Sequence, residues 1–191
     1  MISSMRGCTR ESIGGTPRDE KFDPSPTLEG ALVVLTPLRV DDAVMMAEVL
    51  GDPDIYGWIG GAPPTAERLR TVYAELERGM SRDRTEIWLN WVIRRKPELV
   101  AVGTVQATIF NHGQRAEVAW IISPRWQRMG LATAAADAMI EWLYPARVQK
   151  VTAHIHPDHV ASERVAQHVG LAPTGRLHDG EREWELGVIY R

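Results

Sequence analysis

The spacing of apolar residues divides this chain into short strand-like runs and longer helix-like stretches. Apolar runs bounded by turn residues predict strands. Stretches that begin at a capping residue, such as Asp41 or Thr65, predict helices. The expected strands lie at residues 31–35, 87–93, 99–109, 116–123, 150–156, 171–177 and 181–190, and the expected helices at residues 41–50, 65–80, 133–144 and 157–169.

Glycine and proline mark the expected connections between these segments. Residues 51–54 (GDPD) break the first helix, and residues 57–64 form a glycine- and proline-rich loop. Residues 95–98 and Asp179-Gly180 are expected hairpin turns, and Gly170 is expected just past the end of the last helix. The resulting order, β-α-α-β-β-β-α-β-α-β-β, predicts a mixed α/β (α+β) fold. Its first half is antiparallel, and its second half contains a helical crossover.

Composition limits the class of protein and its setting. The 191 residues are 44% hydrophobic and 25% charged, which is ordinary for a globular domain. Residues 1–28 lack apolar periodicity and are expected to be a flexible tail, so residues 29–191 form a single domain. The net charge of -3 argues against nucleic acid as the main partner. Cys8 is the only cysteine and no apolar run suits a membrane span or a secretory signal, so we expect a reducing, cytoplasmic setting.

Residues 127–132 (QRMGLA) carry the most informative chemistry. They connect a predicted strand to a predicted helix, and the first turn of a helix has backbone N–H groups without internal partners. Gly130 allows close approach of a ligand, and Arg128 adds positive charge, so the turn suits a pyrophosphate. A plain strand-to-helix turn is the alternative. The spacing fits neither the Gly-x-Gly-x-x-Gly pattern of dinucleotide-binding folds nor a P-loop.

The same turn resembles the Gln/Arg-x-x-Gly-x-Gly/Ala signature of the GNAT superfamily of N-acetyltransferases. Gln127, Gly130 and Ala132 stand on its three defined positions. Residues 35–42 are similar to the opening of the ribosomal-protein N-terminal acetyltransferase (RimJ/RimL-like) branch, and residues 157–171 are similar to its later Asn-x-x-Ser motif. His159 replaces the usual Asn and Leu171 the usual Phe, and residues 179–190 match the terminal hairpin.

The resemblance implies a sheet that splays between its fourth and fifth strands, with acetyl-coenzyme A as co-substrate in the gap. The backbone of the fourth strand would bind the pantetheine arm, and the N–H groups of the turn would bind the pyrophosphate. His159 would contact the pantetheine in place of the usual Asn. The implied cofactor-binding residues are Trp120, Ile121, Ile122, Gln127, Arg128, Met129, Gly130, Leu131, Ala132, Thr133 and His159.

Two residues are candidates for proton transfer and one for acceptor binding. Glu117 begins the cofactor strand, where some family members carry a base, although a solvated glutamate paired with Arg115 is the alternative. Ser162 matches the serine that lies near the departing thiolate in this branch and can donate a proton to it, although a helix serine bonded to its own backbone is the alternative. Many other members use a tyrosine at the position of Ala166. Trp58 lies in the loop that family members place over the acceptor.

The acceptor itself stays open between a protein N-terminal amine and a small amine such as an aminoglycoside or a polyamine. Asp52, Asp54 and Glu86 are candidate carboxylates for a polycationic acceptor. A different class of function is a catalytically inactive coenzyme A-binding sensor or interaction module. His154, His156, Asp158 and His159 have strand and cap spacings that need no metal, so none is expected. No membrane partner is expected. Homodimers are frequent in the family, but nothing in the sequence marks an interface.

Overall fold

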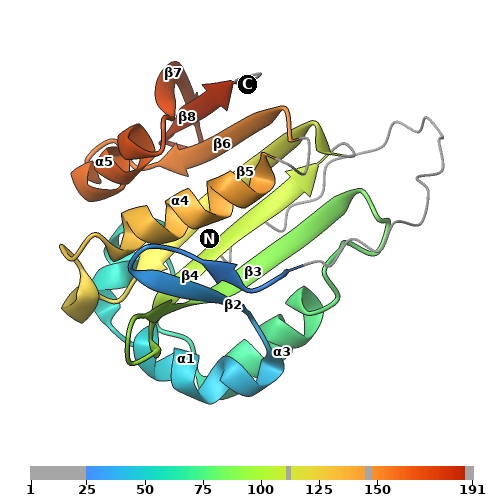
Figure 1. Cartoon of the computed structure of the whole chain (residues 1–191), viewed down its shortest axis with the longest axis vertical. Helices are drawn as coiled ribbons and strands as arrows, with labels where there is room; N and C mark the ends of the chain where they lie inside the picture. The colour runs from blue at the N-terminus through green and yellow to red at the C-terminus, as the bar shows by residue number, and fades with distance from the viewer. Residues whose placement is uncertain (1–24, 111–112, 145–147, 188–191) are drawn as a thin grey trace.

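The computed structural model describes residues 25–110, 113–144 and 148–187. Its strands form one eight-stranded sheet in the order β1-β2-β3-β4-β5-β6-β8-β7 (Figure 1). Neighbouring strands are antiparallel except β5 and β6, which are parallel and joined through a helix. The mixed fold expected from the sequence is therefore confirmed. The strands are β1 (Leu28–Glu29), β2 (Val33–Pro37), β3 (Glu86–Arg95), β4 (Val100–Phe110), β5 (Arg115–Ile122), β6 (Lys150–Ile155), β7 (Ala172–His178) and β8 (Glu181–Gly187).

Helices cover both faces of the sheet. One apolar cluster packs α4 and α5 on one face, and a second packs α1 and α3 on the other (Figure 1). None of the described helices is both long enough and apolar enough to cross a membrane. The α-helices are α1 (Ala43–Val49), α2 (Tyr56–Ile59), α3 (Ala66–Leu76), α4 (Leu131–Leu143) and α5 (Val160–His168), and short 3-10 turns form η1 (Val40–Asp42), η2 (Pro53–Ile55) and η4 (Pro124–Trp126).

Several predicted helix ends and turns have the expected local chemistry. The Thr65 hydroxyl accepts a hydrogen bond from the Arg68 backbone N–H at 3.1 Å, which caps the start of α3. Gly170 follows α5 with φ 88°, and the Leu171 N–H returns to the Ala166 carbonyl at 2.9 Å. The hairpin turn between β7 and β8 has positive φ at both Asp179 and Gly180. These three predictions are confirmed.

The structure corrects three boundaries. Strand β1 precedes the first strand expected from the sequence and pairs with β2. Part of the expected loop at residues 57–64 is helical, so Trp58 lies on α2 rather than in a loop. Helix α3 ends at Leu76, well before the expected end at Met80, because Gly79 turns the chain with φ 69° and Met80 bridges to Ile87.

Some predictions fall outside the described residues. These are most of the expected tail, Cys8, part of the turn at residues 111–114, and the last residues of the final strand. The division into a tail and a single domain stays a prediction.

Strand β3 shows how alternate residues serve the two faces of the sheet. Trp91 is fully buried in the cluster beneath α4, where its ring meets Trp142 at 6.1 Å between centroids. Its indole N–H donates to the Pro26 carbonyl at 2.7 Å and so holds the start of the described chain against the sheet. Val92 faces the other cluster. Trp88 and Trp91, three residues apart, therefore face opposite sides of the strand.

The sheet opens between β5 and β6. Their parallel pairing covers three positions only and stops at Glu117 and Thr152, although β5 continues to Ile122 and β6 to Ile155. Beyond Glu117, β5 pairs on one side alone, with β4. The predicted splay between these strands is confirmed. It leaves a stretch of β5 with backbone groups that β6 does not bind.

Candidate functional site

A cleft of about 980 Å³ lies at the opening between β5 and β6. Its walls come from η2 and α2 on one side and from one face of α5 on another. The end of β5, the turn after it and the first turn of α4 complete the lining. Elements from both halves of the chain therefore meet at one place, which is large enough for a substantial ligand.

The end of β5 lies unusually close to β4, because β4 carries a glycine opposite it. Gly103 pairs with Ile122, and a Cβ at position 103 would lie 2.0 Å from the Ile121 carbonyl oxygen. Only a residue without a side chain allows this approach. The Gln127 side chain holds the end of β5 by donating to the Ile122 carbonyl at 3.1 Å. Gln127 thus has a structural bond as well as a place in the cleft lining.

The turn before α4 presents unpaired backbone donors. Arg128 and Gly130 have φ values of 63° and 73°, and the first helical hydrogen bond is from the Ala134 N–H to the Gly130 carbonyl. The N–H groups of residues 131–133 therefore have no acceptor inside the helix, and they lie at its positive end. Arg128 forms no ion pair with any described residue. This combination suits an anionic group such as a pyrophosphate.

The backbone conformation gives a second reason for glycine at position 130, beside the expected approach of a ligand. A Cβ there would have only the Leu32 side chain nearby, at 3.6 Å, so space in the protein alone does not require glycine. The positive φ does, because residues with a side chain rarely adopt it.

Most residues predicted to bind the cofactor line this one cleft. Met129 is the exception, since its side chain is 45% exposed and lies outside the lining. The roles of these residues remain predictions, although the structure does bring them together. Those that line the cleft are Trp120, Ile121, Ile122, Gln127, Arg128, Gly130, Leu131, Ala132, Thr133 and His159.

An aromatic wall closes one side of the cleft. Trp58 on α2 packs against His159 with 4.7 Å between ring centroids and against His156 at 5.6 Å. Burial lowers the pKa of His159, and the neighbouring His156 lowers it further. Ser162 lines the same cleft and its hydroxyl has no hydrogen-bond partner among the described residues. Trp58, His159 and Ser162, predicted separately, are thus brought together.

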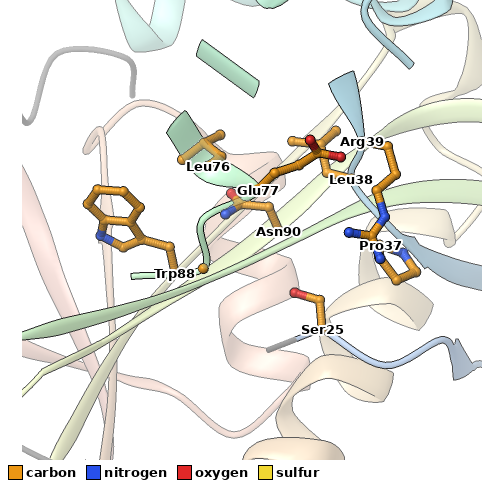
Figure 2. A pocket seen from close by; sticks show the side chains of 9 residues that line it. Ser25, Pro37, Leu38, Arg39, Leu76, Glu77, Trp88 and Asn90 are labelled. Carbon is orange, nitrogen blue, oxygen red and sulfur yellow. The ribbon is translucent and has the colours of Figure 1, made fainter. Parts of the chain in front are cut away.

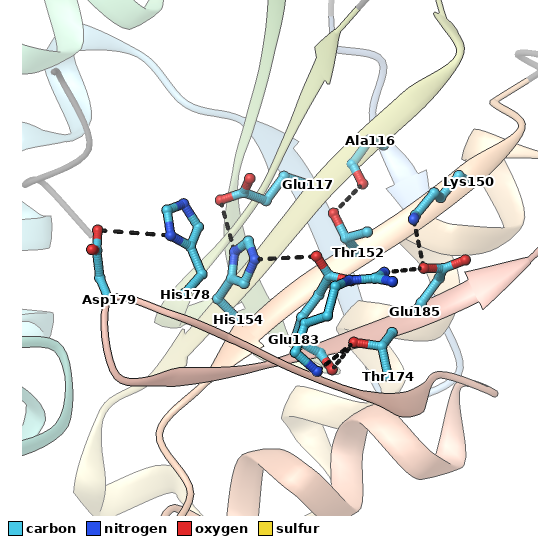
Figure 3. Close-up of polar contacts among 11 residues, drawn as sticks. Ala116, Glu117, Lys150, Thr152, His154, Thr174, His178, Asp179, Glu183 and Glu185 are labelled. Carbon is cyan, nitrogen blue, oxygen red and sulfur yellow. Dashed lines mark hydrogen bonds and ion pairs between the residues drawn. The ribbon is translucent and has the colours of Figure 1, made fainter. Parts of the chain in front are cut away.

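Glu117 lies outside the cleft lining and is engaged elsewhere. Its carboxylate pairs with Nδ1 of His154 at 3.5 Å, and Nε2 of that ring lies 3.9 Å from Glu183 (Figure 3). The hydrogen bond from His154 lowers the pKa of Glu117, and the same bond raises the pKa of His154. Glu117 belongs to the last backbone pairing of β5 with β6, and His154 lies two residues further along β6. Their contact therefore spans the point where the sheet begins to open. Held in this way, Glu117 is ionised at neutral pH and is a weak base.

The neighbourhood of His154 was not predicted from the sequence. His178 on β7 packs edge-on against it with 5.2 Å between ring centroids (Figure 3). Burial raises the pKa of Glu181 at the start of β8. These contacts depend on how β6, β7 and β8 pair, which the sequence does not reveal. Arg164 was missed too, yet it lines the cleft with Ala161 and His168. Helical spacing of three and four residues along α5 was a usable signal for it.

The other candidate polar clusters do not assemble. Asp52 caps η2 through the Asp54 N–H, and Glu86 accepts from the Trp88 indole at 2.8 Å. Of the three carboxylates proposed for a polycationic acceptor, Asp54 alone lines the cleft. His154 and His156 contact different partners. Within the described ranges, no group of three or more His, Cys, Asp or Glu side chains is placed to hold a metal ion.

A second, much smaller cavity lies on the face covered by α3. It measures about 30 Å³ and is bounded by Arg39, Glu77, Trp88 and Asn90, with Ser25 across from them (Figure 2). The Glu77 carboxylate accepts a hydrogen bond from the Val40 N–H at 3.2 Å, so it is engaged in a contact within the protein. The space has room for water but not for a substrate.

A mixed sheet that opens next to a helix N-terminus with free backbone N–H groups is the arrangement of the acetyltransferase class of fold. A model of the acetyltransferase (GNAT) domain matches residues 33–172, and the chain belongs to this family. No curated protein matches the chain.

Solved structures share this fold at low sequence identity. RimJ of Mycobacterium smegmatis, solved with CoA-disulfide, superposes with a TM-score of 0.72 at 19% identity over 85% of this chain and 87% of its own. Ribosomal-protein-S5-alanine acetyltransferase from Vibrio fischeri gives 0.71 at 17% identity, over 85% and 96%. The aminoglycoside acetyltransferase AAC(6')-Ib, solved with coenzyme A, gives 0.66 at 18% identity, over 81% and 94%.

Proposed function

We propose that this protein is an acetyl-coenzyme A-dependent N-acetyltransferase that transfers the acetyl group directly to a primary amine. The observation that carries the proposal is the cleft where the one-sided stretch of β5 leads into the free N–H groups at the start of α4. An open strand edge suits the amides of a pantetheine arm, and a helix N-terminus suits a pyrophosphate. Two of the solved structures that share the fold hold coenzyme A or its disulfide.

The residues of the cleft fit such a co-substrate. Residues 118–122 of β5 have one side free of strand pairing, and Arg128 has no competing ion pair among the described residues. The co-substrate supplies an activated acetyl thioester. We assign the proton for the departing thiolate to Ser162, which lines the cleft and whose hydroxyl has no hydrogen-bond partner among the described residues. The tyrosine position of other members is Ala166, which is fully buried here.

We propose that Glu117 contributes a negative charge to the site. Its carboxylate is ionised by the pairing with His154, and it faces the same side of the sheet as Ile121. A fixed negative charge on this face attracts a cationic acceptor.

For the acceptor, we propose a protein N-terminal amine, which is supported by the similarity to a structure named as a ribosomal-protein-S5-alanine acetyltransferase. The second candidate is a small polycationic amine, an aminoglycoside or polyamine. It is favoured by the carboxylates of Glu117, Glu181 and Glu183 around His154. A coenzyme A-binding module without catalysis is the remaining alternative. A screen separates them: peptides with N-terminal Ala or Ser, spermidine and kanamycin are tested as acceptors, with release of the coenzyme A thiol as the readout.

Binding of the co-substrate is tested by isothermal titration calorimetry. The wild-type protein should bind acetyl-coenzyme A, whereas Gly130→Glu should not, because it places bulk and negative charge at the helix end. Gly175→Glu is the matched control, since Gly175 also has positive φ (80°) and open surroundings but lies outside the cleft lining. No detectable binding of acetyl-coenzyme A or coenzyme A to the wild-type protein refutes the proposed function.

A further inference from the structure

We propose that His159 is the group that removes the proton from the acceptor amine, an inference that rests on the acetyl-transfer function proposed above. The sequence assigns this residue only a contact with the pantetheine, in place of the family's asparagine. Its geometry in the cleft points to a second role.

The imidazole of His159 is held in the cleft, and its ring nitrogens have no partner among the described residues. It lines the cleft with Ser162, which lies one helical turn further along α5. The face of Trp58 holds the ring on one side at 4.7 Å. Neither ring nitrogen forms a hydrogen bond or ion pair with any described residue. A half-buried base with an open lone pair, next to the proposed thiolate donor, has the arrangement that amine deprotonation needs.

The surroundings keep this imidazole neutral. Burial lowers its pKa first, and the charge of His156 lowers it further. His159 is also the N-cap of α5, whose positive end disfavours an imidazolium. The other ionisable groups that line the cleft are Asp54 in η2, Arg128 before α4, and Arg164 and His168 on α5. Asp158 points to solvent at 83% exposure and lies 4.0 Å from His156.

Glu117 is the weaker candidate for the same task. Its carboxylate lies outside the lining residues and is held by His154. A carboxylate whose pKa is lowered below 4.5 accepts a proton from an ammonium poorly. The ring of His159 lines the cleft and has no competing partner among the described residues, so it has the better position.

The proposed step balances as follows. One ring nitrogen of His159 takes a proton from the acceptor ammonium and leaves a free amine. The amine nitrogen bonds to the acetyl carbonyl carbon, and the carbon–sulfur bond breaks. The Ser162 hydroxyl gives its proton to the departing thiolate and regains one from the new amide nitrogen. His159 then releases its proton to solvent.

The test uses His159→Asn, which restores the residue usual in this branch and cannot titrate near neutral pH. For the acceptor that the screen selects, kcat/KM at pH 7 should fall about 100-fold. The acid limb of the pH–rate profile should disappear. Calorimetry should show coenzyme A affinity within about threefold of the wild type, because an amide keeps the pantetheine contact. His159→Gln serves if circular dichroism shows that the Asn variant does not fold.

Two further readouts separate a base from a packing residue. In the protein without co-substrate, proton NMR should show one histidine, identified by its loss in His159→Asn, that titrates below pH 6.5. His156→Asn removes the neighbouring charge and should move the acid limb to higher pH. The inference is overturned if His159→Asn keeps the wild-type rate and acid limb, or if its ring is protonated at pH 7. Wild-type protein that does not bind coenzyme A refutes the proposed function instead.

Discussion

Replacing Gly103 with alanine tests whether the close approach of β4 to the end of β5 shapes the cleft. A Cβ at this position would lie 2.0 Å from the Ile121 carbonyl oxygen, whereas real Cβ atoms do not come closer than 3.0 Å. The atom in the way is backbone in the middle of the sheet, so no side chain can rotate to relieve the contact. The Ile121 carbonyl has to move by about 1 Å, and β5 has to move with it.

The expected losses follow from that displacement. Overpacking of this kind lowers the free energy of unfolding by about 1–3 kcal/mol. For a chain of this length, the melting temperature should fall by roughly 2–10 °C. Because residues 120–122 line the cleft, acetyl-coenzyme A affinity should fall by about tenfold or more.

The assays are thermal unfolding by circular dichroism and calorimetric titration with acetyl-coenzyme A. Gly57→Ala is the stability control, because nothing lies within 4 Å of its added Cβ and it sits in α2. That variant should be as stable as the wild type or slightly more so. If Gly103→Ala unfolds at the wild-type temperature and binds acetyl-coenzyme A as tightly, the close approach at Gly103 does not position the cleft.

Two further substitutions test the proton chemistry and the pair across the opening. Ser162→Ala should lower kcat about 100-fold with little change in the KM for acetyl-coenzyme A, and an unchanged kcat would exclude Ser162 as the thiolate donor. His154→Gln should lower the free energy of unfolding by about 1 kcal/mol, with the largest loss between pH 4.5 and 6.5. Both partners stabilise the folded state in that window. The contribution of Glu117, whose pKa is lowered on folding, is complete above pH 4.5 and is lost on acidification. The contribution of His154, whose pKa is raised on folding, is complete below pH 6.5 and is lost as the pH rises through that raised pKa. Urea unfolding at pH 5.5 and pH 9 measures this difference, and an equal loss at both values would contradict it.

The sheet and its main helices were predictable because their signals are local. Alternation along β3 placed Trp88 and Trp91 on opposite faces, and Thr65 and Gly170 marked helix ends through their own chemistry. Strand β1 was not predictable, since two residues carry no pattern. It forms where the Trp91 indole holds the chain at Pro26.

Helix α2 was missed for the opposite reason, because tertiary packing overrides local preference there. Gly57 disfavours a helix, but the preceding Ile55 is buried and Ile59 packs against the same cluster. The apolar anchors on both sides hold the turn in helical form.

The candidate site, like the fold, was predictable from the sequence only in part. The turn at residues 127–132 was readable from the chain, since strand, glycine and helix follow one another directly. The pairing of Glu117 with His154 and Glu183 was not, because it depends on the register of three strands that are far apart in sequence. Likewise, the contact between Trp58 and His159 joins the first third of the chain to the last.

The one-sided stretch of β5 has a consequence for solubility. A strand with unpaired backbone groups normally invites pairing with another molecule and leads to aggregation. Here that stretch lies in the interior of the sheet, between β4 and the diverging β6. A foreign strand would have to enter between two strands already in place, whereas a narrow, flexible ligand arm can reach the same groups. The unpaired backbone groups of β5 can therefore be reached by a small molecule but not by a strand of another protein.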